Sequence, residues 1–167
     1  MINYKYCPQC KSDLDLEDQY PYCKRCKLTI YLNSKPTASV LIMKGDKLLL
    51  AKRSTNPYKG KYGVVGGFLE NGEDPKSGAL REVKEETGLT ARIEKFLGIY
   101  VDKYEKGEFT FNLYYVGRIA GGKMKAQDDV ASLEWFDLDS LPKPPFKSQI
   151  EVFKDLKKWY FGRGGQN

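Results

Sequence analysis

Short hydrophobic runs separated by turn-forming residues occupy the middle of the chain. Residues 37–43 and 47–53 flank a Lys44-Gly-Asp-Lys47 turn, and this arrangement predicts a β-hairpin. Further segments with a strand-like pattern lie at residues 92–101, 109–119 and 132–137. In the 109–119 segment hydrophobic side chains alternate with other residues, and we expect them to face the core. These side chains are Phe109, Phe111, Leu113 and Tyr115.

Two segments have the hydrophobic spacing of helices, and one of them also has clear boundary residues. Asp74 is a suitable N-cap, Pro75 suits the first helical position, and Gly88 can take the left-handed conformation that ends a helix. Residues 147–160 repeat hydrophobic side chains at helical spacing and predict an amphipathic C-terminal helix packed on the domain. Strands that flank a helix without strict alternation indicate an α+β fold, such as an α-β-α sandwich. The side chains that the first helix would bury are Ala79, Leu80 and Val83.

Composition and charge narrow the class of protein. The chain has 167 residues, of which 41% are hydrophobic, 13% aromatic and 30% charged, as is typical of a globular domain. No hydrophobic run approaches the roughly 20 residues that span a bilayer, and no signal peptide is visible, so we expect a cytoplasmic protein without a membrane span. The net charge of +6 favours acidic partners, either phosphorylated small molecules or nucleic acid. The absence of histidine excludes histidine bases, triads and metal ligands.

All four cysteines lie near the N-terminus, in two Cys-x-x-Cys pairs. Cys7 with Cys10 and Cys23 with Cys26 have the spacing of a tetrahedral zinc site. Two disulfides are one alternative, but a cytoplasmic chain would not keep them oxidised. A redox-active pair is another, but it would not need a second pair at this spacing. Because four thiolates leave no open coordination position, we expect the Zn²⁺ to be structural.

A change of composition at residues 33–36 separates the cysteine-rich segment from the rest of the chain. We predict a zinc ribbon in residues 1–35 and a second domain, which includes the C-terminal helix, in residues 36–167. So short a ribbon cannot bury a core of its own, and zinc binding would supply the missing folding free energy. Residues 1–35 contain six basic and four acidic side chains, so zinc-bound thiolates would bring the ribbon close to neutrality. This balance disfavours a nucleic-acid clamp.

A pair of glycines and the helix that follows them carry the candidate chemistry. Glu82, Glu85 and Glu86 are spaced so that their carboxylates share one face of the helix. A solvated charged face is the common explanation of such a group, but clustered carboxylates are also what Mg²⁺ or Mn²⁺ requires. Gly66 and Gly67 allow backbone groups to approach a ligand closely. Together these features suggest a site for a metal ion and a phosphate.

The same segment resembles the Nudix box, G-x5-E-x7-R-E-U-x-E-E-x-G-U with U aliphatic, at every fixed position. The resemblance extends over residues 36–140 and implies the Nudix-type α-β-α sandwich, a mixed sheet with a loop-helix-loop catalytic motif. It implies a Mg²⁺-dependent pyrophosphohydrolase that acts on a nucleoside diphosphate linked to another group. A zinc ribbon before such a domain is similar to the layout of NADH pyrophosphatases, but their S-Q-P-W-P-F-P signature is missing here. The matching residues are Gly67, Glu73, Arg81, Glu82, Val83, Glu85, Glu86, Gly88 and Leu89.

The resemblance also implies roles for single residues of the box. Glu82 and Glu86 would bind Mg²⁺ (or Mn²⁺) directly, and Glu85 directly or through water. The Gly67 region would add a backbone carbonyl to the metal site. Glu73 and Arg81 correspond to an ion pair that braces the loop-helix-loop, which is a structural role.

Residues outside the box are weaker candidates. The general base varies within the family, and besides a box glutamate the candidates are Asp128 and Asp129, which could equally be loop solubilisers. Arg53 and Lys61 are plausible phosphate contacts, or else ordinary surface cations. Aromatic side chains could stack on a base, although most aromatics at strand spacing belong to the core. The aromatic candidates are Phe68, Tyr100, Tyr104 and Phe111.

The substrate stays open between ADP-ribose-like sugar nucleotides, NAD(H), dinucleoside polyphosphates and (d)NTPs. The ribbon favours a nucleotide sugar or a dinucleotide, and the resemblance also allows a homodimer. A rival from another class is a zinc-ribbon module that binds nucleic acid or protein, with the Nudix domain as a ligand sensor. A hydrolase of capped RNA would combine both ideas, and a purely structural adaptor is a further rival. Because every box carboxylate is intact, we favour an enzyme.

Overall fold

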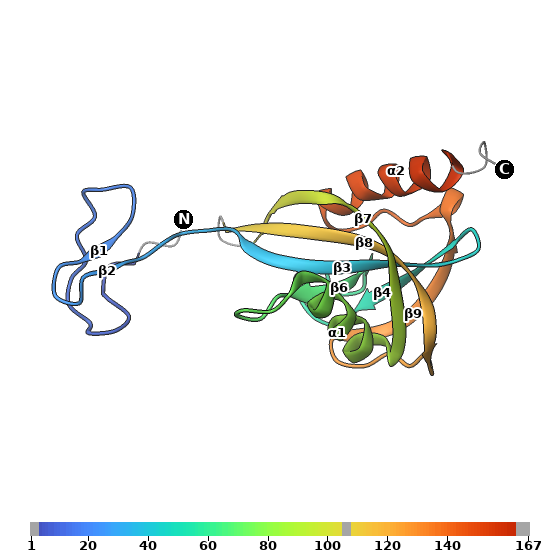
Figure 1. The fold of residues 1–167 in the computed structure, drawn as a ribbon, viewed down its shortest axis with the longest axis horizontal. Helices are drawn as coiled ribbons and strands as arrows, with labels where there is room; N and C mark the ends of the chain where they lie inside the picture. The colour runs from blue at the N-terminus through green and yellow to red at the C-terminus, as the bar shows by residue number, and fades with distance from the viewer. Residues whose placement is uncertain (1–3, 105–107, 163–167) are drawn as a thin grey trace. The chain divides into compact units, whose positions relative to one another are not determined.

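The computed structural model describes residues 4–104 and 108–162, which form two compact units (Figure 1). The first unit contains the N-terminal segment up to Lys35, together with Lys103, Tyr104, Glu108 and Phe109 from a long hairpin. The second unit contains residues 36–102 and the described chain from Thr110 onward.

The first unit is built from short strands around the cysteines. β1 (Tyr22–Cys23) pairs antiparallel with β2 (Leu28–Thr29). Each Cys-x-x-Cys turn is followed by a lysine with positive φ, 61° at Lys11 and 56° at Lys27, so the chain reverses in the same way after both pairs. The buried cluster of this unit is small: its fully buried members are Cys7, Leu14 and Cys23.

A seven-stranded sheet forms the centre of the second unit. Five strands follow the order β5-β4-β3-β8-β7, while β6 pairs with β3 and β9 pairs with β4. The predicted hairpin is present, because Met43 pairs with Leu48 across the turn. The strands are β3 (Lys35–Lys44), β4 (Lys47–Arg53), β5 (Tyr62–Gly63), β6 (Val65–Phe68), β7 (Leu89–Lys103), β8 (Phe109–Gly122) and β9 (Val130–Asp137).

Two helices lie on opposite sides of this sheet (Figure 1). α1 (Pro75–Thr87) has the predicted boundaries: Asp74 accepts hydrogen bonds from two backbone N–H groups of the first turn, and Gly88 has a φ of 68°. α2 (Lys147–Gly162) follows the short 3₁₀ helix η2 (Leu138–Ser140). Within residues 4–104 and 108–162, no helix combines the length and the hydrophobicity needed to cross a lipid bilayer.

Alternating side chains of β3 and β4 supply two separate cores, one under each helix. Because side chains of a strand point to opposite faces in turn, neighbours such as Leu41 and Ile42 belong to different cores. This arrangement confirms the predicted α+β fold with a sheet between two helices. The core under α1 includes Val40, Ile42, Leu49, Ala51, Ala79 and Val83. The core under α2 includes Leu41, Met43, Leu48, Leu50, Val152, Phe153 and Leu156.

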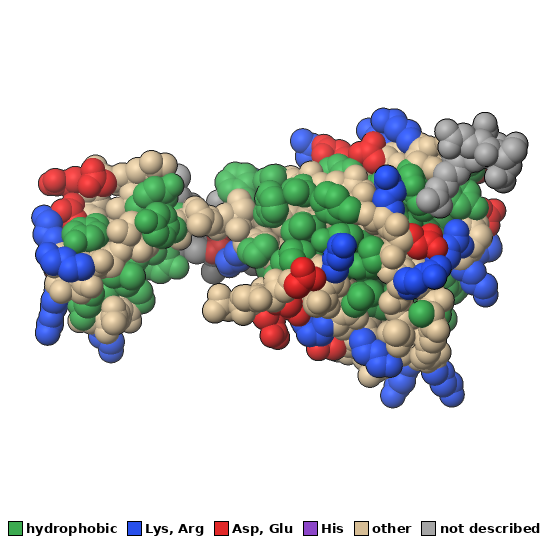
Figure 2. All heavy atoms as spheres, viewed as in Figure 1, with side chains coloured by type: hydrophobic (Ala, Val, Ile, Leu, Met, Phe, Trp, Pro, Cys, Tyr) green, Lys and Arg blue, Asp and Glu red, His purple; other side chains and the backbone are tan. Residues whose placement is uncertain are grey.

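The outer part of β8 reverses the predicted burial. Phe109 and Phe111 are 48% and 38% exposed, whereas Thr110 and Asn112 are buried. Asp102 of β7 accepts hydrogen bonds from Asn112 at 3.3 Å and from a backbone N–H in the first turn of α2 at 2.9 Å. The expectation that both phenylalanines face the core is therefore wrong, because a satisfied polar network occupies the face that α2 covers. Hydrophobic side chains exposed on β7 and β8, where Figure 2 shows a hydrophobic surface, include Phe96, Ile99, Val101 and Phe111.

Candidate active site and cysteine cluster

Glu86 lies near the C-terminal end of α1, against the two glycines of β6, Gly66 and Gly67. Glu86 is only 7% exposed, whereas the side chain of Glu85 is 51% exposed. The two carboxylates therefore do not belong to one solvated face of the helix. The Glu86 Oε2 accepts a hydrogen bond from the backbone N–H of Gly66 at 2.9 Å. Burial raises the pKa of Glu86 from 4.5 to about 9, and the nearby Asp129 and Glu82 add to the rise. A bound cation would oppose each of these effects and favour the carboxylate.

Gly67 lies directly against the carboxylate of Glu82. A Cβ atom at Gly67 would come within 2.6 Å of the Glu82 carboxylate, so a side chain here would displace it. Gly67 also pairs with Ala38 of β3, which fixes the direction of its backbone groups. Burial raises the pKa of Glu82, and the Arg81 guanidinium opposes the rise. The Gly67 backbone and Glu82, both expected at a metal site, therefore lie side by side.

Arg81 connects the loop before α1 with the glutamates of the helix. It donates to both carboxylate oxygens of Glu73, from Nε at 2.8 Å and from Nη2 at 3.0 Å. Its Nη1 donates to Glu82 and to Glu85, each at 2.9 Å. Its Nη2 also donates to the carbonyl oxygen of Phe68 at 3.1 Å. A bidentate pair of this kind fixes orientation as well as charge, which is the bracing geometry expected of Glu73 and Arg81.

We expect Glu73→Gln to lower the free energy of unfolding at neutral pH and to lose this effect in acid. The Arg81 guanidinium, with a hydrogen bond from the Glu70 backbone N–H, lowers the pKa of Glu73 from 4.5 to about 2. Because the folded-state pKa is depressed, the stabilisation is complete above the unfolded-state value and disappears as the pH falls through about 2. Urea unfolding across this range measures the difference, with the exposed Glu70→Gln as the control. A difference that stays constant down to the lowest pH would contradict the assignment.

The carboxylates around Gly66 and Gly67 of β6 suit a hard divalent cation. Asp129 raises the pKa of Glu86 and Asp128 raises the pKa of Glu82, so the loop after β8 faces the carboxylates of α1. Repulsion among carboxylates is what a bound cation relieves, and carboxylate oxygens are the ligands that Mg²⁺ prefers. Glu85 is 51% exposed and bonds to Arg81, which suits a contact through water better than a direct one. These oxygen donors therefore fit Mg²⁺ or Mn²⁺.

A shallow cleft that is open to solvent lies beside Glu86 and Asp129. Arg53 is held at the cleft by a hydrogen bond from its Nε to the carbonyl oxygen of Pro57 at 2.8 Å, and its Nη2 lies 3.7 Å from Asp129 Oδ2. Cationic and anionic groups therefore meet in one concave site, as binding of a metal ion with a phosphate requires. The charged, polar or aromatic side chains that line the cleft are Arg53, Glu86, Asp129, Phe146 and Gln149.

The structure brings only part of the predicted substrate set to this cleft. Lys61 and Phe68 are not among the described residues that line the cleft, and both are exposed elsewhere on the second unit. Tyr104 belongs to the first unit, where its backbone N–H donates to the carbonyl oxygen of Glu108 at 2.7 Å. Phe146 and Gln149 line the cleft but were not predicted as site residues. Their only signal was their position at the start of an amphipathic helix, which indicates packing rather than ligand binding.

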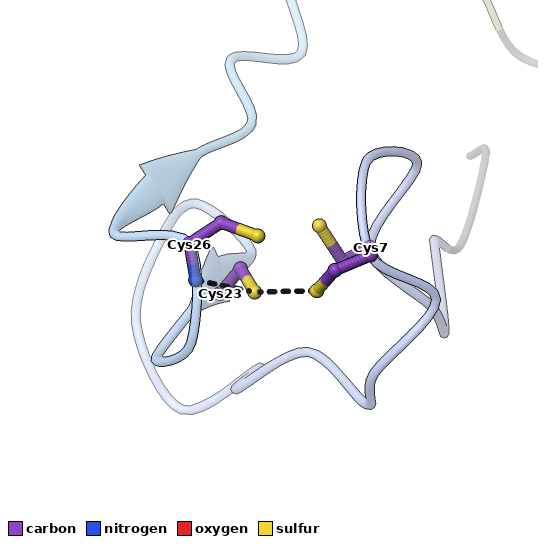
Figure 3. Close-up of side chains that lie close together, drawn as sticks. Cys7, Cys23 and Cys26 are labelled. Carbon is purple, nitrogen blue, oxygen red and sulfur yellow. Dashed lines mark hydrogen bonds between the residues drawn. The ribbon is translucent and has the colours of Figure 1, made fainter.

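The four cysteines converge within the first unit. All are free thiols, and their sulfur atoms lie within 4.8 Å of one another. Figure 3 shows Cys7 facing Cys23 and Cys26 across a common centre. A tetrahedral site with Zn–S bonds of about 2.3 Å places sulfurs about 3.8 Å apart, and the Sγ atoms of Cys10 and Cys23 are 3.6 Å apart. Across residues 4–104 and 108–162, no other group of three potential ligands is this compact, so the cluster fits the predicted zinc.

Hydrogen bonds make the thiols unequal. The Ser12 hydroxyl lies 2.9 Å from the Cys10 sulfur and lowers the pKa of Cys10 to about 6. Ser12 and the Cys26 backbone N–H likewise lower the pKa of Cys23. The neighbouring Cys10 instead raises the pKa of Cys26 to about 12. Four thiolates therefore coexist here only if a cation compensates their charge, which is what coordination of Zn²⁺ would do.

Comparisons with known proteins agree with this geometry. The family profile described as NUDIX domain matches residues 33–156. The chain is 37% identical to the ADP-ribose pyrophosphatase of Methanocaldococcus jannaschii over 138 residues, which cover 81% of this chain and 80% of that protein. It is 28% identical to the NAD-capped RNA hydrolase NudC of Pseudomonas aeruginosa over 95% of this chain, but spans only 56% of NudC. The crystal structure of a NUDIX hydrolase from Nitrosomonas europaea superposes with a TM-score of 0.79 at 22% identity, covering 97% of this chain and 93% of that one.

Proposed function

The chain belongs to the Nudix family of hydrolases, and on this premise we propose that it cleaves ADP-ribose or a closely similar nucleoside diphosphate derivative. Water would add to one phosphorus atom of the diphosphate, and the bond from that phosphorus to the bridging oxygen would break. The other phosphate would leave with the bridging oxygen. From ADP-ribose the two products would be AMP and ribose 5-phosphate. The similarity to an ADP-ribose pyrophosphatase over most of both chains supports this substrate class.

The single observation that carries the proposal is the meeting of Glu86, Asp129 and Arg53 at one cleft. A diphosphate needs a cation to approach carboxylates, and it needs a fixed positive group to hold it at the reacting position. The carboxylates provide the cation site and Arg53 provides the fixed charge. A purely structural adaptor would not need a buried carboxylate beside further carboxylates and a cation at one cleft.

Each residue of the site has a proposed task. Glu82, Glu86 and the Gly67 backbone hold Mg²⁺ or Mn²⁺, with Glu85 reached through water. When bound, this cation supplies Lewis-acid stabilisation of the charge on the phosphates. Asp129 accepts the proton of the attacking water, and we prefer it to Asp128 because it lines the cleft whereas Asp128 does not.

The function is tested by a hydrolysis screen with Mg²⁺ and with EDTA. The substrates would be ADP-ribose, NADH, NAD⁺, diadenosine polyphosphates and the (d)NTPs, with products separated by chromatography. We expect ADP-ribose to give AMP and ribose 5-phosphate, with the highest kcat/KM of the panel and no turnover in EDTA. Higher kcat/KM with (d)NTPs or diadenosine polyphosphates would replace the proposed substrate class. No turnover of any compound by the folded, metal-loaded protein would contradict the enzyme itself.

Hydrolysis of NAD-capped RNA is a second candidate. The similarity to NudC extends over 95% of this chain, so it includes the cysteine-rich segment as well as the Nudix domain. The missing S-Q-P-W-P-F-P signature disfavours it relative to ADP-ribose. A short NAD-capped RNA added to the screen separates the two, because the preferred substrate has the higher kcat/KM.

A further inference from the structure

Gln149 has a buried hydrogen-bond acceptor that the protein itself does not use. The residue is 6% exposed and lies in the first turn of α2, where it lines the cleft beside Glu86 and Asp129. Among the described residues, its Oε1 is the one buried side-chain nitrogen or oxygen atom that lacks a hydrogen-bond partner. Buried acceptors are nearly always paired, so an orphan beside a catalytic cleft calls for an external donor.

The carboxamide of Gln149 lies close to the backbone of β5. A Cβ atom at Gly63 would come within 3.2 Å of Oε1 and 3.3 Å of Nε2. The absence of a side chain at Gly63 gives the carboxamide its space.

An aromatic side chain accompanies this acceptor. Phe146 lines the same cleft, and its ring meets the ring of Tyr58 edge to face, with centroids 5.1 Å apart. Tyr58 is 48% exposed, so this aromatic pair extends from the cleft to the surface. Neither ring has a task in holding a cation or a diphosphate. Flat aromatic surface next to a lone acceptor is the combination that binds a nucleobase with an amino group on its edge.

We propose that Gln149, Phe146 and Tyr58 form a subsite for the adenine base, in which the Gln149 carboxamide oxygen accepts a hydrogen bond from the 6-amino group. This inference rests on the proposed function, because it places the diphosphate of the same molecule against Arg53 and the carboxylates. It makes Gln149 a residue that determines base specificity. A hypoxanthine base carries a carbonyl oxygen where adenine carries the amino group, and that oxygen would meet the Gln149 oxygen with no proton between them.

The test compares ADP-ribose with its inosine counterpart, which differs only in the base. Affinities are measured by titration calorimetry in Ca²⁺, with products followed by chromatography so that cleavage and binding are read separately. We expect the wild type to bind ADP-ribose on the order of tenfold more tightly than the inosine compound, since the usual cost of an unmatched buried acceptor includes this factor. Equal affinity for the two compounds, or no binding of either, would overturn the subsite.

Gln149→Met removes the acceptor at almost the same side-chain length. We expect it to lose the preference for adenine, mainly through weaker binding of ADP-ribose, while the melting temperature stays the same or rises because the orphan atom is gone. Gln19→Met, the same change at an exposed position of the first unit, should keep the preference. Gly63→Ala, which crowds the carboxamide without removing it, should weaken the preference and serves if Gln149→Met does not fold. Equal losses for both compounds would mean a structural role and would overturn the proposal.

Failure of this subsite and failure of the proposed function give different results. If the protein binds ADP-ribose preferentially but does not cleave it in Mg²⁺, the adenine subsite is supported and the proposed activity is contradicted. Cleavage of ADP-ribose and the inosine compound with equal kcat/KM, together with equal affinities, would leave the activity and remove the subsite.

Discussion

Glu86→Gln is expected to slow Mg²⁺-dependent hydrolysis strongly and, in the absence of metal, to stabilise the protein. The carboxamide keeps the hydrogen bond from the Gly66 N–H but cannot provide the charge that a divalent cation requires. Loss of a direct metal ligand removes several kcal/mol of transition-state stabilisation, so we expect kcat to fall on the order of 10³-fold. The exposed Glu70→Gln, in the loop before α1, is the control and should keep full activity.

The gain in stability follows from the raised pKa of Glu86. In the folded, metal-free protein the carboxyl keeps its proton up to about pH 9, whereas in the unfolded chain it ionises near 4.5. The unfolded state therefore releases a proton over this interval, and the stability of the wild type falls as the pH rises through it. The glutamine variant has no such proton, so it should become progressively more stable than the wild type, by at most about 1.4 kcal/mol per pH unit.

Chemical denaturation in EDTA at several pH values measures this second effect. The two proteins should have similar free energies of unfolding near pH 5 and should diverge toward pH 9. If the curves run parallel at every pH, Glu86 is not the buried, protonated group that the structure indicates. If hydrolysis persists in the variant at the rate of the Glu70→Gln control, Glu86 is not a metal ligand. The opposite signs of the two effects separate a catalytic defect from a folding defect.

Local signals in the sequence predicted some elements closely. Asp74 and Gly88 determine the ends of α1 through hydrogen bonds and backbone conformation within a few residues, so both ends were predicted correctly. The two Cys-x-x-Cys pairs each form a tight turn, and the short chain between them returns through the antiparallel bridge of Asp15 with Tyr22. In both cases the determining interactions lie close together along the chain, where a pattern can reveal them.

Interactions between distant segments decided what the pattern missed. Phe109 and Phe111 alternate with polar residues, as the side chains of a buried strand face do. Thr110 and Asn112 are buried instead, and Asp102 accepts hydrogen bonds from Asn112 and from the first turn of α2. Strands β7 and β9 are also longer than predicted, because pairing with a neighbouring strand extends each of them beyond its hydrophobic run. Gln149 and Phe146 reach the cleft only because α2 packs next to β5, which no local signal in their own segment indicates. The boundary between residues 35 and 36 stays a prediction, and so do the roles of Asp128 and Asp129.

Cys23→Ser is expected to unfold the predicted ribbon while the second unit stays folded. Cys23 is fully buried, and its sulfur lies 3.6 Å from that of Cys10 and 3.3 Å from the backbone N–H of Cys26. The buried cluster around it contains few apolar side chains, so bound zinc would have to supply most of its folding free energy. Structural zinc contributes on the order of 10 kcal/mol, and a serine hydroxyl is a poor replacement for a thiolate.

Three measurements on one preparation check this expectation. The wild type should contain one zinc per chain, and Cys23→Ser close to none. Limited proteolysis should cleave the variant within residues 4–34 while the fragment from about residue 36 onward resists, with its melting temperature changed little. Ser12→Ala is the matched control: it removes a hydroxyl that contacts the Cys10 and Cys23 sulfurs but no ligand, so zinc affinity should fall about 10- to 100-fold with the ribbon still folded. A protease-resistant N-terminal segment in metal-free Cys23→Ser would show that the hydrophobic contacts of the ribbon hold it together without zinc.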